Sequence, residues 1–268
     1  MSTIQKLAPA AFAFDRVADR FDARFQPWLS VAAQRRTVRR ALLDAFPPGA
    51  RLLDIGGGTG LDAAWLTERG RHVHLTDPAP QMVREAVAKL GSHSVSVAGA
   101  EDLAELEHDF DRFDGAYSNF AALNCVEDLD SFASGLAKLL RPGAPVLLVL
   151  FGTFCPAEML VEAAHGRWRQ VFRRFSRNDI PARLGGHNFS VRYHRRPDLR
   201  AAMKPWFSYH GRQAVGLFVP PSAAEPWISG RPSLLRALEA LDGPLARPLA
   251  IFGDHILYRF VRSGESSQ

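Results

Sequence analysis

The chain is poor in cysteine and has no long apolar run. Its 268 residues include only two cysteines, Cys125 and Cys155, which excludes a disulfide framework and favours reduced thiols. No Cys/His cluster has metal-site spacing, so no metal is expected. No apolar run approaches the roughly 20 residues needed to span a bilayer. The N-terminus lacks the apolar core of a signal peptide, and we therefore expect a cytoplasmic protein without a membrane span.

Internal repeats are also missing, and the only low-complexity stretch is the polar tail GESSQ. With 47% hydrophobic residues, a chain of this length can bury one large core. We therefore expect a single domain over residues 1–268. The net charge of +5 is compatible with nucleic-acid binding, so the motifs must decide whether the protein is of that class.

Residues 51–60 read RLLDIGGGTG, a short apolar strand that breaks into glycines. An amphipathic segment follows, and strand, glycine turn and helix in this order are typical of a nucleotide site at the carboxyl edge of a parallel sheet. Asp77 ends the next apolar run, 73–76. A carboxylate in that position can accept two hydrogen bonds from a ribose diol.

Two classes of ligand fit this turn. The segment GTGLDA, residues 58–63, satisfies the loose dinucleotide fingerprint of nicotinamide-dependent oxidoreductases. Asp54 favours another ligand, because a buried acid directly before the glycines is costly unless a ligand needs it. Its charge suits S-adenosylmethionine, which carries an ammonium and a sulfonium but no phosphate.

The string LLDIGGGTG resembles the first motif of class I S-adenosylmethionine-dependent methyltransferases. LTDPAPQMVREA, residues 75–86, resembles the second motif of that family. FDGAYSNFAALN, residues 113–124, looks like the fourth strand and the loop that passes the methyl group. LLRPGAPVLLVLFG, residues 139–152, is similar to the turn before the fifth strand, with Ala144 in place of a glycine. The resemblance covers about residues 14–152.

This resemblance implies a cofactor site for S-adenosylmethionine. The glycine turn would lie beside the amino-acid portion of the cofactor, Asp77 on the ribose, Met82 over the adenine, and Glu101 or Asp102 near the adenine amino group. Structural roles are open for several of them: Asp77 and Asn124 could cap helices, and Met82 could simply pack. The predicted cofactor-binding residues are Asp54, Gly56, Gly58, Gly60, Asp77, Met82, Glu101, Asp102, Asn119 and Phe120.

The alternation of apolar runs and amphipathic segments predicts a doubly wound, Rossmann-like α/β fold. We expect a mostly parallel seven-stranded sheet whose last strand is antiparallel. Strands are predicted near 51–55, 72–76, 94–98, 113–118, 145–151, 206–213 and 255–262. The chain divides into an N-terminal helical cap (1–47, with two helices in 12–46), a cofactor-binding core (48–152), a substrate insertion (153–204) and closing elements (205–268).

Aromatic residues recur at roughly helical spacing in the N-terminal cap: Phe14, Phe21, Phe25 and Trp28. This spacing fits a helix packed on the sheet. In related methyltransferases such a segment closes over the cofactor, and the resemblance therefore predicts a lid.

The insertion is expected to be irregular and basic. Residues 166–200 contain ten arginines against Asp179 and Asp198, interleaved with Phe172, Phe175, Phe189 and Tyr193. The segment could be a solvated surface, a lid that attracts an aromatic or anionic substrate, or a nucleic-acid surface. The last is least favoured, because no RRM, KH or helix-turn-helix pattern occurs.

The predicted function is methyl transfer from S-adenosylmethionine to O, N or C of a small molecule. A nicotinamide-dependent oxidoreductase and an RNA-modifying methyltransferase are the alternatives. No catalytic residue is assigned. His165, His187 and Glu158 are the candidates for a general base, because they lie in or beside the insertion, near the expected substrate cavity.

Overall fold

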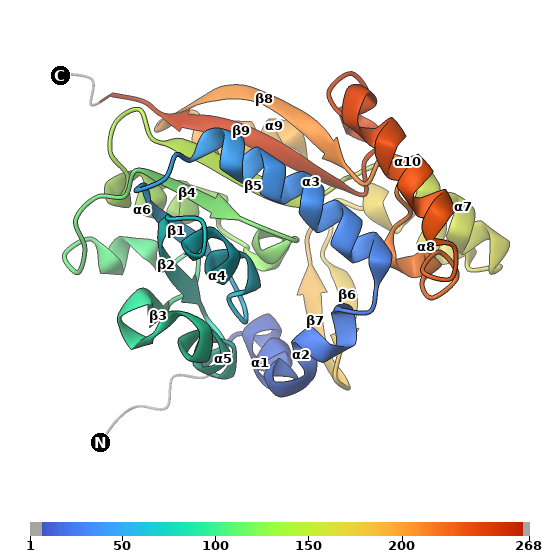
Figure 1. The fold of residues 1–268 in the computed structure, drawn as a ribbon, viewed down its shortest axis with the longest axis horizontal. Helices are drawn as coiled ribbons and strands as arrows, with labels where there is room; N and C mark the ends of the chain where they lie inside the picture. Colours follow the sequence, from blue (N-terminus) through green and yellow to red (C-terminus); the bar gives the residue numbers. More distant parts are fainter. Residues whose placement is uncertain (1–6, 265–268) are drawn as a thin grey trace.

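A seven-stranded sheet forms the centre of the computed structural model, which describes residues 7–264 (Figure 1). The strand order is β3-β2-β1-β4-β5-β9-β8, and β9 runs antiparallel to both of its neighbours, β5 and β8. The strands are β1 (Arg51–Ile55), β2 (His72–Asp77), β3 (Val95–Val97), β4 (Gly115–Ser118), β5 (Pro145–Phe151), β8 (Phe207–Val215) and β9 (His255–Arg262). The predicted fold class is confirmed, including the closing antiparallel strand.

Two apolar layers hold this sheet, one on each face. Successive residues of a strand point to opposite faces, so a strand buried on both sides reads as a continuous apolar run. In β1, Leu52 belongs to one buried cluster and Leu53 to the other. The run Val146–Leu150 of β5 alternates between the same two clusters. The apolar stretches of the sequence therefore mark central strands.

Helices cover both faces of the sheet. One apolar cluster joins it to α3, α4 and α5, and the other joins it to α6 and α9. The helices are α1 (Pro9–Asp15), α2 (Ala18–Phe25), α3 (Leu29–Ala45), α4 (Leu61–Thr67), α5 (Pro80–Leu90), α6 (Leu129–Leu139), α7 (Pro156–Ala164), α8 (Trp168–Val171), α9 (Arg196–Met203) and α10 (Pro232–Leu245). Within residues 7–264, no helix is both long and apolar enough to cross a membrane.

Two predictions about local structure were wrong. The N-terminal cap contains three helices rather than two, because the chain turns once more before α2. The basic insertion is not irregular: it forms α8, the hairpin β6 (Ile180–Leu184) and β7 (His187–Val191), and α9. Gly185 and Gly186 close this hairpin with φ of 56° and 89°, the left-handed pair that a two-residue hairpin turn requires.

The hairpin and the N-terminal cap lie side by side (Figure 1). Phe14 packs against Phe189 with ring centroids 5.7 Å apart, and Phe12 meets His187 edge-on at 5.0 Å. On its other side, α1 is fixed to α5 because Asp15 accepts a hydrogen bond from the Gln81 amide at 2.7 Å. The cap therefore bridges the cofactor-binding core and the insertion.

Candidate cofactor and acceptor site

A cavity of about 270 Å³ lies at the carboxyl edge of the parallel strands. This is where ligands bind in doubly wound sheets. Its walls come from the ends of β1, β2 and β4, from the loop after β3, and from the N-terminal cap. All ten predicted cofactor-binding residues except Gly60 line it: Asp54, Gly56, Gly58, Asp77, Met82, Glu101, Asp102, Asn119 and Phe120.

At Gly56 and Gly57 the glycine turn has room for backbone only. A Cβ on Gly56 would meet the Ala122 Cβ at 2.5 Å, and one on Gly57 would lie 2.6 Å from the Asp54 carboxylate. Gly60 instead begins α4 in a left-handed conformation, with φ of 81°. The turn therefore exposes main-chain atoms to the cavity, as a ligand that approaches the backbone requires.

Asp77 joins the turn to the end of β2. One carboxylate oxygen accepts the Gly58 amide hydrogen and the other accepts that of Ala79, each at 2.9 Å. Burial raises the pKa of Asp77 from 3.8 to about 6, although both backbone hydrogen bonds lower it. Asp77 is therefore a fixed hydrogen-bond acceptor at the cavity wall, and each oxygen keeps a lone pair for a ligand hydroxyl.

This pKa makes ligand binding depend on pH. We expect the affinity for S-adenosylhomocysteine to fall as the pH drops through about 6, because protonated Asp77 loses acceptor capacity. The stability of the unliganded protein should change oppositely, rising as the pH falls from about 6 towards 3.8, since the folded state binds the extra proton. Calorimetric titrations and urea unfolding across this range measure both.

Asp77→Asn is the matched control for this pH dependence. It should cost about 1.5–3 kcal/mol of ligand binding at neutral pH and remove the part of the pH effect centred near 6. An unchanged affinity in the folded variant would sink the assignment of Asp77 to the ligand.

Asp54 is buried directly beneath the glycine turn. Its Oδ2 atom and the hydroxyl of Tyr117, on the neighbouring strand β4, are both buried without a hydrogen bond of normal geometry to any described residue. The two groups are nonetheless close enough to influence each other electrostatically. Burial, and then the nearby carboxylate of Asp62, raise the pKa of Asp54 well above its ordinary range. A cation in the cavity would remove this cost.

Arg35 and Asp62 complete the cavity wall, and the sequence analysis missed both. Asp62 accepts hydrogen bonds from Arg39 at 2.8 Å and from Asn119 at 3.1 Å. Arg35 lies over the Phe120 ring at 5.3 Å, and its buried Nε, 3.8 Å from Asp62 Oδ1, has no hydrogen-bond partner among the described residues. Asp62 stands in the GTGLDA segment and could have been noticed there. Arg35 belongs to an ordinary amphipathic helix and gives no signal in the sequence.

The loop after β4 contains two residues in an unusual backbone conformation. Phe120 and Ala121 have φ of 49° and 67°, a region that residues other than glycine seldom adopt. Such strain clusters at functional sites, where the surrounding structure must hold it. It turns Phe120 into the cavity wall beside Asn119.

The adenine side of the predicted site carries two acids. Glu101 accepts hydrogen bonds from the Glu127 and Asp128 amides, at 2.9 and 2.6 Å, and thereby fixes the loop before α6. Asp102 accepts one from Gly99 at 3.3 Å. Both nevertheless line the cavity, as does the fully buried Met82. Their contact with adenine stays a prediction.

None of the three candidate bases is among the described residues that line the cavity. Glu158 is buried and paired with Arg173 and Arg174, which together lower its pKa although burial raises it. His165 is exposed at the end of α7, where its Nδ1 lies 2.7 Å from the Val161 carbonyl. His187, in the β6–β7 hairpin, packs against Phe12 of α1. No base can be assigned from this arrangement.

The N-terminal cap covers the cavity. Phe14 of α1 and Phe21 of α2 contribute to its wall. Asp22 fixes α2 over the glycine turn, because it accepts the Thr59 hydroxyl at 2.6 Å and lies 3.2 Å from the Lys89 ammonium. Helices α1 and α2 thus have the position of the predicted lid.

Removal of this cap should weaken ligand binding. A chain that lacks residues 1–26 has neither α1 nor α2. We expect it to bind S-adenosylhomocysteine about tenfold more weakly, because the ligand would no longer bury apolar surface against Phe14 and Phe21. Titration calorimetry measures the affinity, and a chain that lacks residues 1–6 alone is the control. Full affinity in a folded truncated protein would mean that the cap is no lid.

Comparison with known proteins agrees with this geometry. Residues 28–194 match a family model described as a methyltransferase domain, and the chain belongs to that family. The resemblance to class I S-adenosylmethionine-dependent methyltransferases is thus confirmed, and the protein is an enzyme of this kind.

Two relatives and one solved structure illustrate the range of similarity. The malonyl-[acyl-carrier protein] O-methyltransferase of Salmonella typhimurium is 26% identical over 244 residues, 90% of this chain and 81% of that one. The demethylmenaquinone methyltransferase of Clavibacter sepedonicus is 32% identical over 143 residues, 52% and 57% of the two chains. The fold also matches the Burkholderia thailandensis 1,6-didemethyltoxoflavin-N1-methyltransferase, with a TM-score of 0.54, 17% identity, and coverage of 98% of this chain and 94% of that one.

Proposed function

We propose that the cavity binds S-adenosylmethionine through charges that match an amino-acid zwitterion. The observation that carries this proposal is a pair of buried polar atoms in one cavity wall that make no hydrogen bond of normal geometry to a described residue. Arg35 Nε has only a longer ion pair, 3.8 Å from the Asp62 carboxylate. Asp54 Oδ2 needs a donor or a cation, and Arg35 Nε needs an acceptor. The ammonium and carboxylate of the methionine portion would supply one each. Nicotinamide dinucleotides have no such pair, which disfavours the oxidoreductase alternative.

The remaining cofactor contacts follow from this orientation. Asp77 would accept hydrogen bonds from the ribose hydroxyls, and Met82 with Glu101 or Asp102 would face the adenine. The bound cofactor supplies a methyl group on a positively charged sulfur. The protein contributes by alignment and by excluding water, since in-line transfer depends strongly on geometry.

We further propose a small-molecule acceptor that is aromatic or anionic. It would lie between the Asn119–Asn124 loop and the β6–β7 hairpin, which are joined because the Asn124 amide donates to the Arg192 carbonyl at 2.6 Å. The aromatic walls formed by Phe14, Phe21 and Phe120 support this class, and Arg35 could serve an anionic group. The ten arginines of the insertion do not support it, since among the described residues none lines the cavity.

Named substrates of the relatives suggest where to begin. Their names state malonyl-[acyl-carrier protein] and demethylmenaquinone as acceptors, and both are candidates for this chain. The acceptor atom can be O, N or C. An RNA acceptor remains the alternative from the sequence, but nothing at the cavity favours it. A cytoplasmic location also stays a prediction.

The first test compares two ligands by calorimetry. S-adenosylhomocysteine should bind and NADH should not, and the reverse result would overturn the cofactor assignment. A second test supplies methyl-tritiated S-adenosylmethionine with aromatic and carboxylate acceptors and measures label transfer. Binding of S-adenosylhomocysteine with transfer only to neutral aliphatic acceptors would contradict the acceptor class and leave the cofactor assignment intact.

A further inference from the structure

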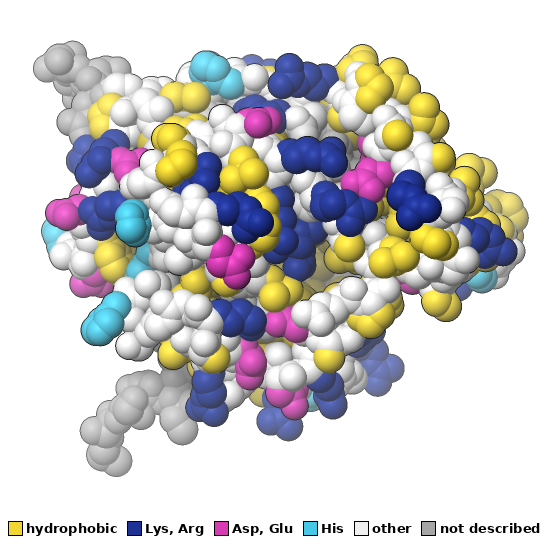
Figure 2. All heavy atoms as spheres, viewed as in Figure 1, with side chains coloured by type: hydrophobic (Ala, Val, Ile, Leu, Met, Phe, Trp, Pro, Cys, Tyr) yellow, Lys and Arg dark blue, Asp and Glu magenta, His cyan; other side chains and the backbone are white. Residues whose placement is uncertain are grey.

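Large apolar side chains gather on the outside of α7, α8 and the segment that leads into α10. They include Leu160, Trp168, Phe172, Phe175 and Trp227, with exposed fractions of 73%, 64%, 58%, 43% and 53%. We call these five residues, with Leu234 and Ile251, the tip surface. In Figure 2, hydrophobic and basic side chains mix at the right-hand end of the molecule, over α7, α8 and α10. Monomeric proteins seldom expose large contiguous apolar patches without a function.

A chain of aromatic contacts links part of the tip surface. Phe172 contacts Phe175 at 6.2 Å, Phe175 contacts Phe154 at 5.8 Å, and Phe154 contacts Phe252 at 5.5 Å, next to Ile251. Beneath it, Val161 of α7 packs in one apolar cluster with Ile228 and Leu235. This cluster joins α7 to the segment that carries Trp227 and to α10.

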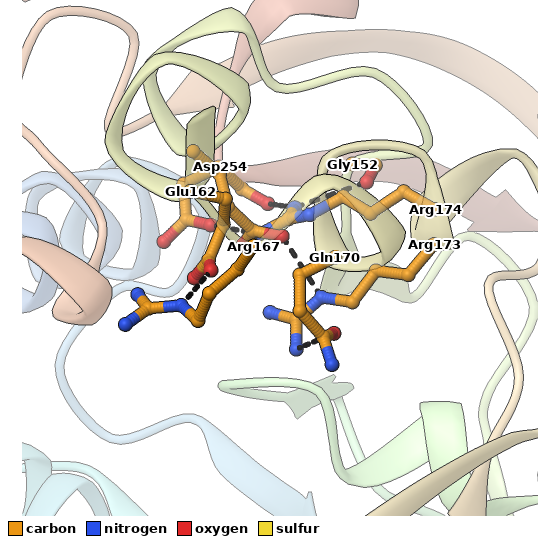
Figure 3. Close-up of polar contacts among 8 residues, drawn as sticks. Gly152, Glu162, Arg167, Gln170, Arg173, Arg174 and Asp254 are labelled. Carbon is orange, nitrogen blue, oxygen red and sulfur yellow. Dashed lines mark hydrogen bonds and ion pairs between the residues drawn. The ribbon is translucent and has the colours of Figure 1, made fainter. Parts of the chain in front are cut away.

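The exposed charges on this surface are mostly positive. In residues 156–178 and 222–237, every exposed Asp, Glu, Lys or Arg is an arginine: Arg167, Arg169, Arg177, Arg231 and Arg236. The exposed Asp179 follows the first range and is paired with Arg192. The acids of 156–178, Glu158 and Glu162, are buried in ion pairs, and Figure 3 shows Glu162 paired with Arg167. Internal pairing thus removes negative charge from the surface and leaves arginines around the aromatic residues.

We propose that the tip surface docks on a lipid bilayer with anionic headgroups. Tryptophan prefers the interfacial layer of a bilayer, and arginines attract its anionic lipids. Apolar groups with a rim of basic residues are the composition of interfacial binding elements. Arg231 lies 4.5 Å from the Trp227 ring, so cation and aromatic group reach the same depth. This proposal rests on the surface and does not depend on the proposed acceptor.

Two other occupants fit the surface less well. A second copy of the chain, bound through the same patch, would place arginines against arginines, because a two-fold interface pairs a surface with itself. A nucleic acid would match the arginines and the aromatic rings, but it has no place for protruding aliphatic side chains such as Leu160 and Leu234. Only a lipid surface uses both the charge and the aliphatic groups.

Co-sedimentation of the whole protein with vesicles tests the proposal. We expect binding to vesicles of phosphatidylcholine and phosphatidylglycerol that is at least about tenfold tighter than to phosphatidylcholine alone. The variant Trp168→Ser/Phe172→Ser and the variant Arg169→Gln/Arg177→Gln should each weaken that binding by about tenfold. The control Arg196→Gln/Lys204→Gln removes two exposed cations, one at the start of α9 and one directly after its end, outside the tip surface, and should change vesicle binding by less than about twofold.

Unchanged circular dichroism and unchanged affinity for S-adenosylhomocysteine establish that the variants are folded. The proposal is overturned if the protein ignores phosphatidylglycerol vesicles, or if the α9 control weakens binding as much as the tip variants do. A dimer in sedimentation velocity that Trp168→Ser/Phe172→Ser abolishes would assign the surface to a second copy. Single-stranded RNA that binds the same residues and displaces the vesicles would assign it to nucleic acid.

Discussion

Replacement of Arg174 by methionine is expected to lower the free energy of unfolding by about 3–5 kcal/mol, the cost of breaking a buried ion pair from one side. Arg174 is buried between the insertion and the sheet. Its guanidinium pairs with Glu158 and, at 2.6 Å, with Asp254, and it donates to the Gly152 carbonyl at 3.0 Å (Figure 3). Methionine fills similar space but leaves both carboxylates buried without this cation.

The loss should also alter the response to acid. Burial alone would raise the pKa of Asp254, but His255 and Arg174 together hold it below its ordinary value. A carboxyl group with a lowered folded-state pKa stabilises the protein above its unfolded pKa, here 3.8, and this contribution fades as the pH falls further. Arg174→Met should therefore lose most stability near neutral pH and less in acid.

Arg177→Met is the matched control, since Arg177 is exposed in the same segment. It should change stability by no more than about 0.5 kcal/mol, as typical for surface sites. Urea unfolding at neutral and acidic pH measures both variants. Equal, small effects would show that the buried cluster contributes specificity rather than stability.

The sequence was sufficient for the sheet but not for its periphery. Central parallel strands are buried on both faces, so runs such as Val146–Leu150 are apolar throughout and easy to place. The β6–β7 hairpin was missed because one of its faces is only half-buried, and the other is exposed and carries Pro181 and Arg183. Its pairing follows from the Gly185-Gly186 turn.

The residues of the candidate site likewise divide into those that the local sequence predicts and those that it does not. Asp54 and Asp77 are set by local pattern, since Asp54 is the penultimate residue of β1, before the glycine turn, and Asp77 is the last residue of β2. Arg35 reaches the cavity only because α3 packs across the sheet, and no spacing in the sequence encodes that approach. The role of the insertion arginines stayed open for a related reason: composition cannot distinguish a buried, paired arginine such as Arg174 from an exposed one.

Asp54→Asn is expected to separate ligand binding from stability. Loss of the carboxylate should weaken S-adenosylhomocysteine binding by about 3 kcal/mol, or roughly 100-fold, because the ligand ammonium would then be buried without a counter-charge. The unliganded variant should be at least as stable as the parent protein. Its buried Asn has the same shape and no charge, and the Tyr117 hydroxyl lies next to it as a possible partner.

The pH dependence gives a second readout of the same residue. The pKa of Asp54 is raised in the unliganded protein, so its ionisation costs stability as the pH rises above the unfolded value of 3.8. A bound ammonium should lower that pKa and release a proton to the buffer. Calorimetry in buffers of different ionisation enthalpy detects this release, which Asp54→Asn should reduce. A variant that is destabilised and yet binds S-adenosylhomocysteine with full affinity would make Asp54 a structural residue, and the cation in the cavity would need another partner.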